Sequence, residues 1–575
     1  MKMLLLSMLF ISVAFAYETG DAHSDCIKGV VAPSCKPYYY VTKSYRRYDG
    51  LCNNLRFPHV GAGRTPLRRL IWANYVDQRQ VDTPRGFPGT KPRVPPANKV
   101  SLAVFHAKQN DDGNRWKLST LFMTMGQFLD HDFALVGHSK CKAQSCNSKD
   151  AYKYPCFPIK FTDYGSKCTP FTRSQPICQK APAGRRTDRQ IANLITSFVD
   201  LSQVYGASIE HAKKLRKNDG SGEMAMRSGN LLPLSNEPCD TIGGCSMAGD
   251  PRADENIALY SMHTVWIREH NRVVKKLRKN HKTWSGEKLY QEARKIVIAE
   301  YQHIIFNDWV PRIVDIGPYT GYSSRYDATL INAFSTAAFR FGHSLVPNEW
   351  QQCNSNYDKI AKDISLQSSF FNIGSINQRG IEPTVYGLMA NQSNQMDTNF
   401  AFDLVRRLFV PPGHHEHHDL TALNIQRGRD HGLPTYGAWR KYCRLPPISS
   451  YKDLEQYMSI ESVKSFQKLY SHPNDIDLFA AGIAEHNVPR FQTGPIFRCL
   501  FWHQFKRLRE GDRYYYLNPG VFTHAQRREL TKTSMAKILC NNLNGIVSIN
   551  KDAFAQVTSK RTICNNIQDV NLDHF

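Results

Sequence analysis

Apolar residues recur at helical spacing along much of the chain, and this pattern predicts a mainly α-helical fold. Helices are expected over Leu118 to about Leu135, from Asp250-Pro251 onward, over Glu287 to Trp309, and over Asn332 to Val346. The residues expected on the buried sides are Ile257, Tyr260, Thr264, Ile267, Val274 and Leu277 in the second helix, Leu289, Ala293, Val297 and Ile304 in the third, and Phe334, Ala338, Phe341 and Leu345 in the fourth. The sequence shows no sustained alternation of apolar and polar residues, so very little β structure is expected.

The first of these helices carries polar side chains within an otherwise apolar segment, MTMGQFLDHDF, from Met123 to Phe133. Residues three and four apart share a face of a helix, so Met123, Gln127, Asp130 and His131 should lie along one side. Burying a carboxylate, a carboxamide and an imidazole is costly unless each has a partner or a role. Taken alone, Asp-His-Asp is more often a helix end with an acidic cap and a satisfied core histidine.

Two loops rich in turn-forming residues interrupt the helical pattern. Thr83 to Pro96 reads TPRGFPGTKPRVPP and is expected to be an extended surface loop. The segment from Cys141 to Cys178 is rich in Pro and Gly and is expected to be a surface loop tied by disulfides. Because motifs on both sides of the first loop are assigned below to one site, we expect a single large domain over residues 17–575, with its core at about residues 35–564.

The beginning of the chain predicts export. A basic start at Lys2, a short apolar run and the ending Ala14-Phe15-Ala16 are typical of a secretory signal peptide over residues 1–16. No later uninterrupted apolar run approaches the ~20 residues of a membrane-spanning helix. We therefore expect a secreted, extracellular protein without a membrane span.

The fifteen cysteines of an exported chain are expected to form mainly disulfides. Their odd number leaves at least one thiol free or available to another chain. Spacing alone does not determine which cysteines pair.

The formal net charge of +24 and the isoelectric point near 9.4 favour attraction to anionic matrix, glycans or acidic substrates. Nucleic acid is disfavoured as a partner, because the charge is scattered in short groups such as Arg68-Arg69 and Lys275-Lys276 and because the chain is exported. The preferred interpretation of the charge is an ordinary well-solvated surface.

Two segments suggest metal ions. Thr196, Asp200 and Ser202 place hard oxygen ligands close together, as Ca²⁺ requires, and Asp132 would complete the set from the first helix. The cluster from His414 to His418 follows Pro411-Pro412-Gly413, which predicts an exposed loop and adventitious zinc binding rather than a built metal site. His343 is a single histidine beside an apolar stripe, where a structural role is the ordinary interpretation.

Six motifs, taken together in order, change these interpretations. GQFLDHDF, TSFVDLS, DPRADEN, SMHTVWIREHNR, FRFGHSLV and ALNIQRGRDHGLPTY resemble the animal haem peroxidases, the peroxidase–cyclooxygenase superfamily that includes myeloperoxidase. The resemblance covers roughly Cys35 to Cys564. It implies a single large α-helical domain that binds haem b.

The resemblance also implies a role for each matching residue. On the distal side, His131 corresponds to the distal histidine, Gln127 to the distal glutamine and Arg252 to the distal arginine. His343 corresponds to the proximal ligand of the haem iron. Asn424 would accept the other ring proton of His343, and Arg427 would lie nearby. Asp130 and Glu255 correspond to the two carboxylates that form ester bonds to haem. The calcium shell corresponds to Asp132, Thr196, the carbonyl oxygen of Phe198, Asp200 and Ser202.

The implied chemistry is the reduction of hydrogen peroxide through an oxoferryl haem, followed by oxidation of a donor. A neutral His131 would move a proton between the two peroxide oxygens, Arg252 would stabilise developing negative charge, and His343 would donate electron density to iron. The expected donors are phenols, catechols or protein tyrosines, for example in catecholamine destruction in saliva or in cross-linking of eggshell or cuticle.

One departure from the family pattern narrows the expected chemistry. Asn256 stands where myeloperoxidase has a methionine bonded to haem, so at most two ester links are expected and efficient chloride oxidation is disfavoured. The alternatives are a defence peroxidase that oxidises bromide or iodide, and a non-catalytic adhesion protein that keeps the fold. Absence of Arg-Gly-Asp and Lys-Gly-Asp tripeptides counts against the adhesion protein.

The resemblance further implies six disulfides: Cys35–Cys52, Cys141–Cys156, Cys146–Cys168, Cys239–Cys245, Cys443–Cys499 and Cys540–Cys564. It leaves Cys26, Cys178 and Cys353 unassigned, and Cys178 lies near the position at which myeloperoxidase joins its halves. A disulfide dimer through Cys178 is therefore a hypothesis. Asn391 begins the only N-x-S/T signal for glycosylation.

Overall fold

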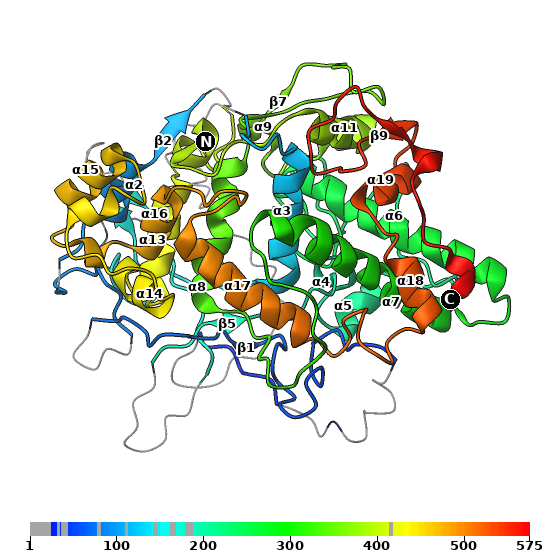
Figure 1. Cartoon of the computed structure of the whole chain (residues 1–575), viewed down its shortest axis with the longest axis horizontal. Coiled ribbons are helices and arrows are strands. Elements are labelled where there is room, and N and C mark those ends of the chain that lie inside the picture. The colour runs from blue at the N-terminus through cyan, green and yellow to red at the C-terminus, as the bar shows by residue number, and fades with distance from the viewer. Residues whose placement is uncertain are drawn as a thin grey trace, which may run out of the picture.

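The computed structural model describes residues 25–31, 35, 44–76, 82–91, 93–109, 113–141, 146, 148, 150–160, 168–178, 188–412 and 418–575. The predicted signal peptide and His414 to His417 lie outside these residues. Helices dominate the described part of the chain, and strands are very short (Figure 1). The prediction of a mainly α-helical fold with little β structure is confirmed.

The longer helices form the frame of the molecule. They are α2 (Ala97–Val104), α3 (Thr120–Phe133), α6 (Ile257–Asn280), α7 (Gly286–Ile304), α11 (Glu382–Ala390), α13 (Leu420–Asp430), α15 (Ile460–Leu469), α17 (Pro495–Glu510) and α19 (Met535–Asn542). The shorter ones are α4 (Ser202–Tyr205), α5 (Ile209–Lys214), α8 (Asn332–Thr336), α9 (Leu366–Ser369), α10 (Gly374–Arg379), α12 (Phe402–Arg406), α14 (Tyr436–Tyr442), α16 (Leu478–Ala484) and α18 (His524–Leu530).

Single turns of other helical types and five strand pairs complete the fold. The turns are η1 (Ile305–Trp309), a π-helix, and the 3₁₀ helices η2 (Val310–Arg312), η3 (Ala338–Leu345), η4 (Tyr451–Leu454), η5 (Pro473–Asp475), η6 (Cys564–Asn566) and η7 (Leu572–His574). Antiparallel pairs join β1 (Thr65–Pro66) to β5 (Ala192–Asn193), β3 (Ile159–Lys160) to β4 (Cys168–Thr169), β6 (Glu349–Trp350) to β7 (Ile364–Ser365), and β9 (Ser548–Ile549) to β10 (Thr562–Ile563). One parallel pair joins β2 (His106–Lys108) to β8 (Asn399–Ala401).

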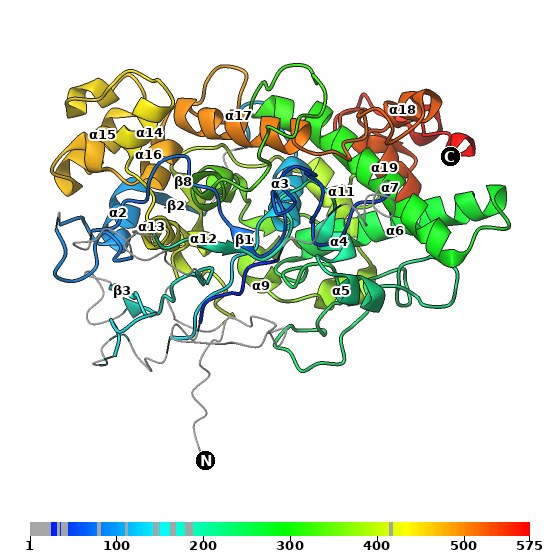
Figure 2. The ribbon, with the colours of Figure 1, turned by 90° about the horizontal axis from the view of Figure 1, so that it is seen from below.

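Helix α3 crosses the middle of the molecule, with α6 and α7 extending to one side and α13 to α16 on the other (Figures 1 and 2). Helices α6 and α7 pack along each other, α3 packs against both α6 and η3, and η3 also packs against α17. Within the described residues, no helix combines the length and apolar character needed to cross a bilayer.

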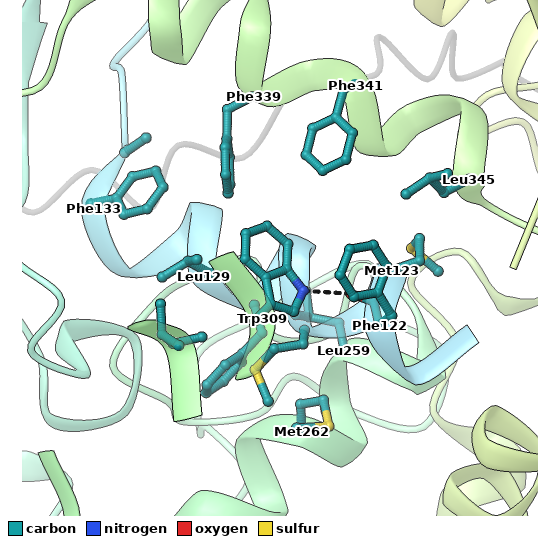
Figure 3. Close-up of a cluster of buried hydrophobic side chains, with 14 of the residues drawn as sticks. Phe122, Met123, Leu129, Phe133, Leu259, Met262, Trp309, Phe339, Phe341 and Leu345 are labelled. Carbon is teal, nitrogen blue, oxygen red and sulfur yellow. Dashed lines mark hydrogen bonds between the residues drawn. The ribbon is translucent and has the colours of Figure 1, made fainter. Parts of the chain in front are cut away.

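Trp309 occupies the centre of the apolar contact between α3 and η3 (Figure 3). Its ring stacks on Phe122 of α3 with 5.3 Å between centroids and lies 5.9 Å from Phe339 of η3. The indole nitrogen donates a hydrogen bond of 2.9 Å to the carbonyl of Phe122. Met262 of α6 packs beneath this cluster. These contacts fix the position of α3 relative to η3, the two elements that carry the polar residues singled out above.

Two of the four predicted helices begin or continue differently from the prediction. The second was expected to start at Asp250-Pro251, but α6 begins at Ile257, because the Asn256 side chain caps it by accepting a hydrogen bond of 2.9 Å from the Leu259 N–H. Asp250 is instead bonded to Arg252, as described below. The third helix is confirmed, since α7 runs on through the π-turn η1 to Trp309.

The fourth predicted helix is divided into two. Helix α8 ends at Thr336, Ala337 adopts φ −128° and ψ −62°, and the chain continues as the 3₁₀ helix η3. A 3₁₀ helix has three residues per turn, so side chains three apart superimpose along its axis. This places Arg340 in line with His343 on one side of η3, closer to superposition than the same spacing gives in an α-helix.

All six disulfides implied by the resemblance are present, together with a seventh, Cys26–Cys178. Cys353 is buried and is the free cysteine of the chain. The hypothesis of a dimer through Cys178 is therefore wrong, because its sulfur is already bonded to Cys26 within the chain.

The internal bond predicts that replacing Cys178 leaves the size of the molecule unchanged. Cys178→Ser should migrate on a non-reducing gel like the unaltered protein, and peptide mapping of the unaltered protein should recover Cys26 linked to Cys178. A dimer band that disappears in Cys178→Ser would contradict this pairing.

Candidate active site

Three consecutive side chains at the end of α3 enter three different surroundings. Asp130 lies 3.7 Å from a nitrogen of Arg252, His131 is 4% exposed and faces Asp250 and Glu255, and Asp132 is fully buried against the loop before α4. Successive helical residues point about 100° apart, so one turn of α3 serves all three. The predicted side of Met123, Gln127, Asp130 and His131 is divided: Met123 belongs to the buried apolar cluster, whereas the other three lie near Asn256, Arg252 and Glu255 respectively. Asp132 turns away from them.

Arg252 is fixed by two hydrogen bonds to one carboxylate. Its Nε and Nη2 atoms each donate to an oxygen of Asp250 over 2.8 Å, and Nη2 also donates to the carbonyl of Ala134, the residue that ends α3. Burial acts against ionisation of Asp250, but the Arg252 guanidinium holds the pKa of this carboxyl at about 2. A planar guanidinium held in this way keeps one orientation.

His131 is a buried neutral imidazole. Burial, assisted by the positive charge of Arg252, holds its pKa well below the usual 6.5. Its Nδ1 lies 3.8 Å from Asp250 and its Nε2 lies 3.8 Å from Glu255, and neither distance is a hydrogen bond. Nδ1 has no hydrogen-bond partner within the described part of the chain, so the ring is available to accept or donate a proton.

Gln127 and Asn256 form the end of the site next to Glu255. The Asn256 amide donates to Oε1 of Gln127 over 3.1 Å. Burial raises the pKa of Glu255 to about 7, although Arg252 opposes the shift. Burial likewise raises the pKa of Asp130 to about 6, against the influence of Arg252 and Arg340. Both shifts make these carboxyls easier to protonate than free ones.

On η3, His343 and Arg340 meet the same partner. The Nδ2 atom of Asn424 lies 2.9 Å from Nδ1 of His343. The Oδ1 atom of Asn424 accepts a hydrogen bond of 2.5 Å from Arg340. Burial, with Arg340 nearby, lowers the pKa of His343 to about 3, so the imidazole is neutral and able to bind a metal. The predicted pairing of His343 with Asn424 is observed, although Asn424 presents its nitrogen rather than its oxygen.

Arg340 connects the η3 side of the site to the α3 side. Burial lowers its pKa to about 10, and the charges that act on it include those of Asp130 and Arg252. Its Nε atom is buried without a partner among the described residues. The side chains of Arg252 and Asp130 remain 27% and 33% exposed, and the space that they face, where the resemblance places haem, is termed the haem recess.

These residues fit a haem group. A haem needs a neutral imidazole for its iron, and His343 supplies one. It carries two propionate carboxylates, which match the unsatisfied cation Arg340. Asp130 and Glu255, whose side chains are 33% and 23% exposed, place two carboxyls beside the same recess, as ester bonding to a porphyrin would require.

The segment predicted to bind calcium is assembled around Asp132. The two oxygens of Asp132 accept backbone N–H bonds from Asp200 at 3.0 Å and Ser202 at 2.6 Å, and the Thr196 hydroxyl donates to both oxygens of Asp200 at 3.0 and 3.1 Å. Burial raises the pKa of Asp132 well above 3.8, and the charge of Asp200 adds to the shift. A cation among these oxygens would relieve the repulsion. Phe198 lies buried in the same loop.

Two residues of the site, Asp250 and Arg340, were not identified from the sequence, and a third, Arg427, makes its contacts elsewhere. Asp250 was interpreted as a helix start. Its position two residues before Arg252 was the signal that could have identified it as the carboxylate that binds Arg252. Arg340 precedes His343 by three residues, a spacing that puts both on one face of a helix and was the available signal. Arg427 donates its hydrogen bonds to Thr172, Ser174 and Asp430, and none of those described goes to His343 or Asn424. Its proposed role near haem stays a prediction.

Comparison with known proteins places this geometry in a family. Residues 45–554 match the family model of the animal haem peroxidases. The chain is 35% identical to thyroid peroxidase of Homo sapiens over 96% of its length and 64% of that protein, and 35% identical to the peroxidasin homolog of Homo sapiens over 92% of its length and 39% of that protein. It thus spans between about two fifths and just under two thirds of these curated relatives.

Solved structures agree with the sequence comparison. Peroxidase A from Dictyostelium discoideum superimposes with a TM-score of 0.77 at 27% identity, covering 89% of this chain and 99% of that one. A fatty acid alpha-dioxygenase from Oryza sativa, at 17% identity and a TM-score of 0.74, shares the fold. The match over most of the chain, with every implied motif in place, shows that this protein is a member of the animal haem peroxidase family.

Proposed function

We propose that this protein is a secreted haem peroxidase that reduces hydrogen peroxide and oxidises phenolic, catechol or tyrosyl donors. The observation that carries the proposal is the neutral, unpartnered His131 imidazole beside an Arg252 guanidinium that Asp250 holds in one orientation. Such a pair supplies a proton acceptor and a fixed positive charge at the same place. Haem, bound through His343, supplies the electrons for cleavage of the peroxide O–O bond.

His131 moves the proton and Arg252 stabilises the charge. In this role the imidazole takes a proton from the inner peroxide oxygen and returns it to the outer oxygen, which leaves as water. Arg252 faces the negative charge that grows on the leaving oxygen, and because Asp250 already orients it, no reorganisation is needed during the reaction. An adhesion protein without catalysis would have no use for this arrangement.

Asn424 controls the basicity of His343. A metal-bound imidazole keeps its proton on the other nitrogen, and Asn424 is the group that contacts Nδ1 of His343. With iron bound, the Oδ1 atom of Asn424 would accept a hydrogen bond from that N–H. In this structure Oδ1 accepts its hydrogen bond from Arg340, so we infer that Arg340 then turns to a haem propionate. A hydrogen bond of this kind makes the ligand more electron-rich.

Asp130 and Glu255 are the groups we propose to form ester links to haem. Asn256 cannot form the additional sulfur link of myeloperoxidase, and its amide is already engaged by Gln127 and by the N-terminus of α6. Bromide or iodide is therefore a more accessible halide donor than chloride. The seven disulfides support an extracellular location, where a basic surface would favour anionic matrix or glycans.

We also propose that calcium binds among Asp132, Thr196, Phe198, Asp200 and Ser202. Asp132 follows His131 directly, so a cation held there would fix the end of α3 from behind the active site. Its effect on catalysis would act through the position of the helix.

Histidine variants test the proposed roles. His343→Ala should lose the Soret band or peroxidase activity, whereas His131→Ala should keep the band and react with hydrogen peroxide about a thousandfold more slowly, because general acid–base catalysis is lost. Stopped-flow absorption measures the reaction, with guaiacol, a catecholamine, tyrosine and halides as donors and the exposed His524→Ala as control. A normal rate in His131→Ala would refute its assignment.

The depressed pKa of His131 predicts the pH profile of the reaction with peroxide. The active base is the neutral imidazole, so the rate constant should stay level through the usual histidine range near pH 6.5 and fall only in more acidic solution. Stopped-flow measurements across this range test the sign. A rate that halves near pH 6.5, tracking an ordinary histidine, would contradict the burial effect.

Calcium removal should destabilise the fold around α3. Chelation should lower the free energy of unfolding by about 3 kcal/mol relative to protein held at roughly a hundred times the dissociation constant for calcium. Asp200→Asn should abolish this calcium dependence, whereas Asp315→Asn, at an exposed surface position, should keep it. Thermal unfolding followed by circular dichroism measures the difference, and a calcium response retained by Asp200→Asn would exclude the site.

A further inference from the structure

A continuous series of aromatic rings leads from the active-site elements toward the surface. Trp309 lies against Phe339 of η3, four residues before His343, as Figure 3 shows. Trp309 also lies 6.3 Å from Phe505 of α17, between ring centroids, and Phe505 lies 6.0 Å from Phe339, so the three rings contact one another. Phe505 in turn lies 6.5 Å from Phe306, which shares η1 with Trp309.

The series ends at a pair of tyrosines. Phe306 lies 5.5 Å from Tyr515, and Tyr515 lies 4.9 Å from Tyr516. Every step is within the range of ordinary aromatic contact, 4.5–7 Å between centroids. Electrons therefore have a path of packed π-systems between η3 and Tyr516.

Tyr516 differs from the other rings in the series because a base is bonded to its hydroxyl. The Tyr516 hydroxyl lies 2.7 Å from Nδ1 of His303, and the amide of Asn307 lies 3.2 Å from the same nitrogen. Burial lowers the pKa of His303 to about 4, so the ring is neutral and can accept the phenolic proton. Tyr516 is buried, His303 is half-buried and Asn307 is exposed, so the pair reaches the surface through His303.

A second tyrosine–histidine pair lacks both the path and the exposure. Tyr205 lies 3.1 Å from Nδ1 of His270, and both side chains are fully buried. The aromatic contacts that the described residues give Tyr205 are with His270 and Tyr290, away from Trp309. It provides a control of matched chemistry.

We propose that Tyr516 and His303 form a remote oxidation site, at which phenolic groups on donors too large for the haem recess, such as tyrosines of other proteins, are oxidised. The proposal rests on the proposed peroxidase function, which supplies the oxidant. It adds a second place of donor oxidation, with macromolecular phenols as its substrates.

The reaction at this site balances in electrons and protons. Tyr516 loses one electron along the series Tyr515, Phe306, Phe505 and Trp309 toward the haem site, and its phenolic proton moves to Nδ1 of His303. A donor phenol at the surface then returns one electron, Tyr516 recovers its proton from His303, and the donor releases its own proton to solvent. Over a full turnover, one hydrogen peroxide, two donor electrons and two protons give two waters, and two donor phenols become phenoxyl radicals.

Freeze-quench electron paramagnetic resonance gives a readout separate from activity. After one equivalent of hydrogen peroxide without donor, the haem-loaded protein should show a tyrosyl radical whose spectrum narrows when its tyrosines are ring-deuterated. Tyr516→Phe and His303→Gln should each reduce this signal by about tenfold, whereas Tyr205→Phe should retain it. An undiminished signal in Tyr516→Phe, or an equal loss in Tyr205→Phe, would overturn the proposal.

Donor size separates the remote site from the haem recess. With tyramine coupled to a large neutral dextran, Tyr516→Phe should lose about tenfold in kcat/KM relative to the unaltered protein, while guaiacol oxidation should change less than about twofold. Equal rates on the dextran donor would overturn the remote site. Failure of the unaltered protein to oxidise guaiacol would instead refute the proposed peroxidase function, and matching Soret bands and thermal unfolding would show that each variant is folded and loaded.

Discussion

Burial of ionisable groups between α3, the segment before α6, and η3 is the constraint on which the rest of the structure depends. Six ionisable side chains meet there with few direct hydrogen bonds among them: Asp130, His131, Arg252, Glu255, Arg340 and His343. Shielding such groups from water, even in part, is costly unless they are paired. Only Arg252 and Asp250 satisfy each other fully, so the remaining groups are arranged for a bound partner rather than for stability.

The apolar frame holds this polar set in register. Trp309 fixes η3 against α3, and the 3₁₀ geometry of η3 aligns Arg340 with His343 at Asn424. On the opposite side of α3, Asp132 anchors the loop of the proposed calcium site. One helical turn thus joins the proposed ion site, the proposed proton-transfer group and a carboxyl beside the haem recess, so a change behind α3 would reach the recess through the helix.

The sequence predicted the helical class, the positions of two of the four helices and six disulfides, because periodicity and family motifs are local properties. It failed where tertiary partners decide the outcome. Asp250 resembles a helix start, yet its carboxylate is taken by Arg252, so Asn256 becomes the cap. The division of α8 from η3 and the partner of Cys178 are likewise invisible in spacing. Arg340 was missed because its importance depends on its contact with Asn424, which is distant in sequence.

The central claim is that the imidazole of His343 holds the haem iron opposite His131 and Arg252. Resonance Raman spectroscopy of the reduced His343→Gly variant, loaded with haem in the presence and absence of free imidazole, tests it most directly. The account predicts that the iron–imidazole stretching band of the unaltered protein is absent from the variant and returns when imidazole is added. A variant that keeps the band without added imidazole would show that another residue binds the iron.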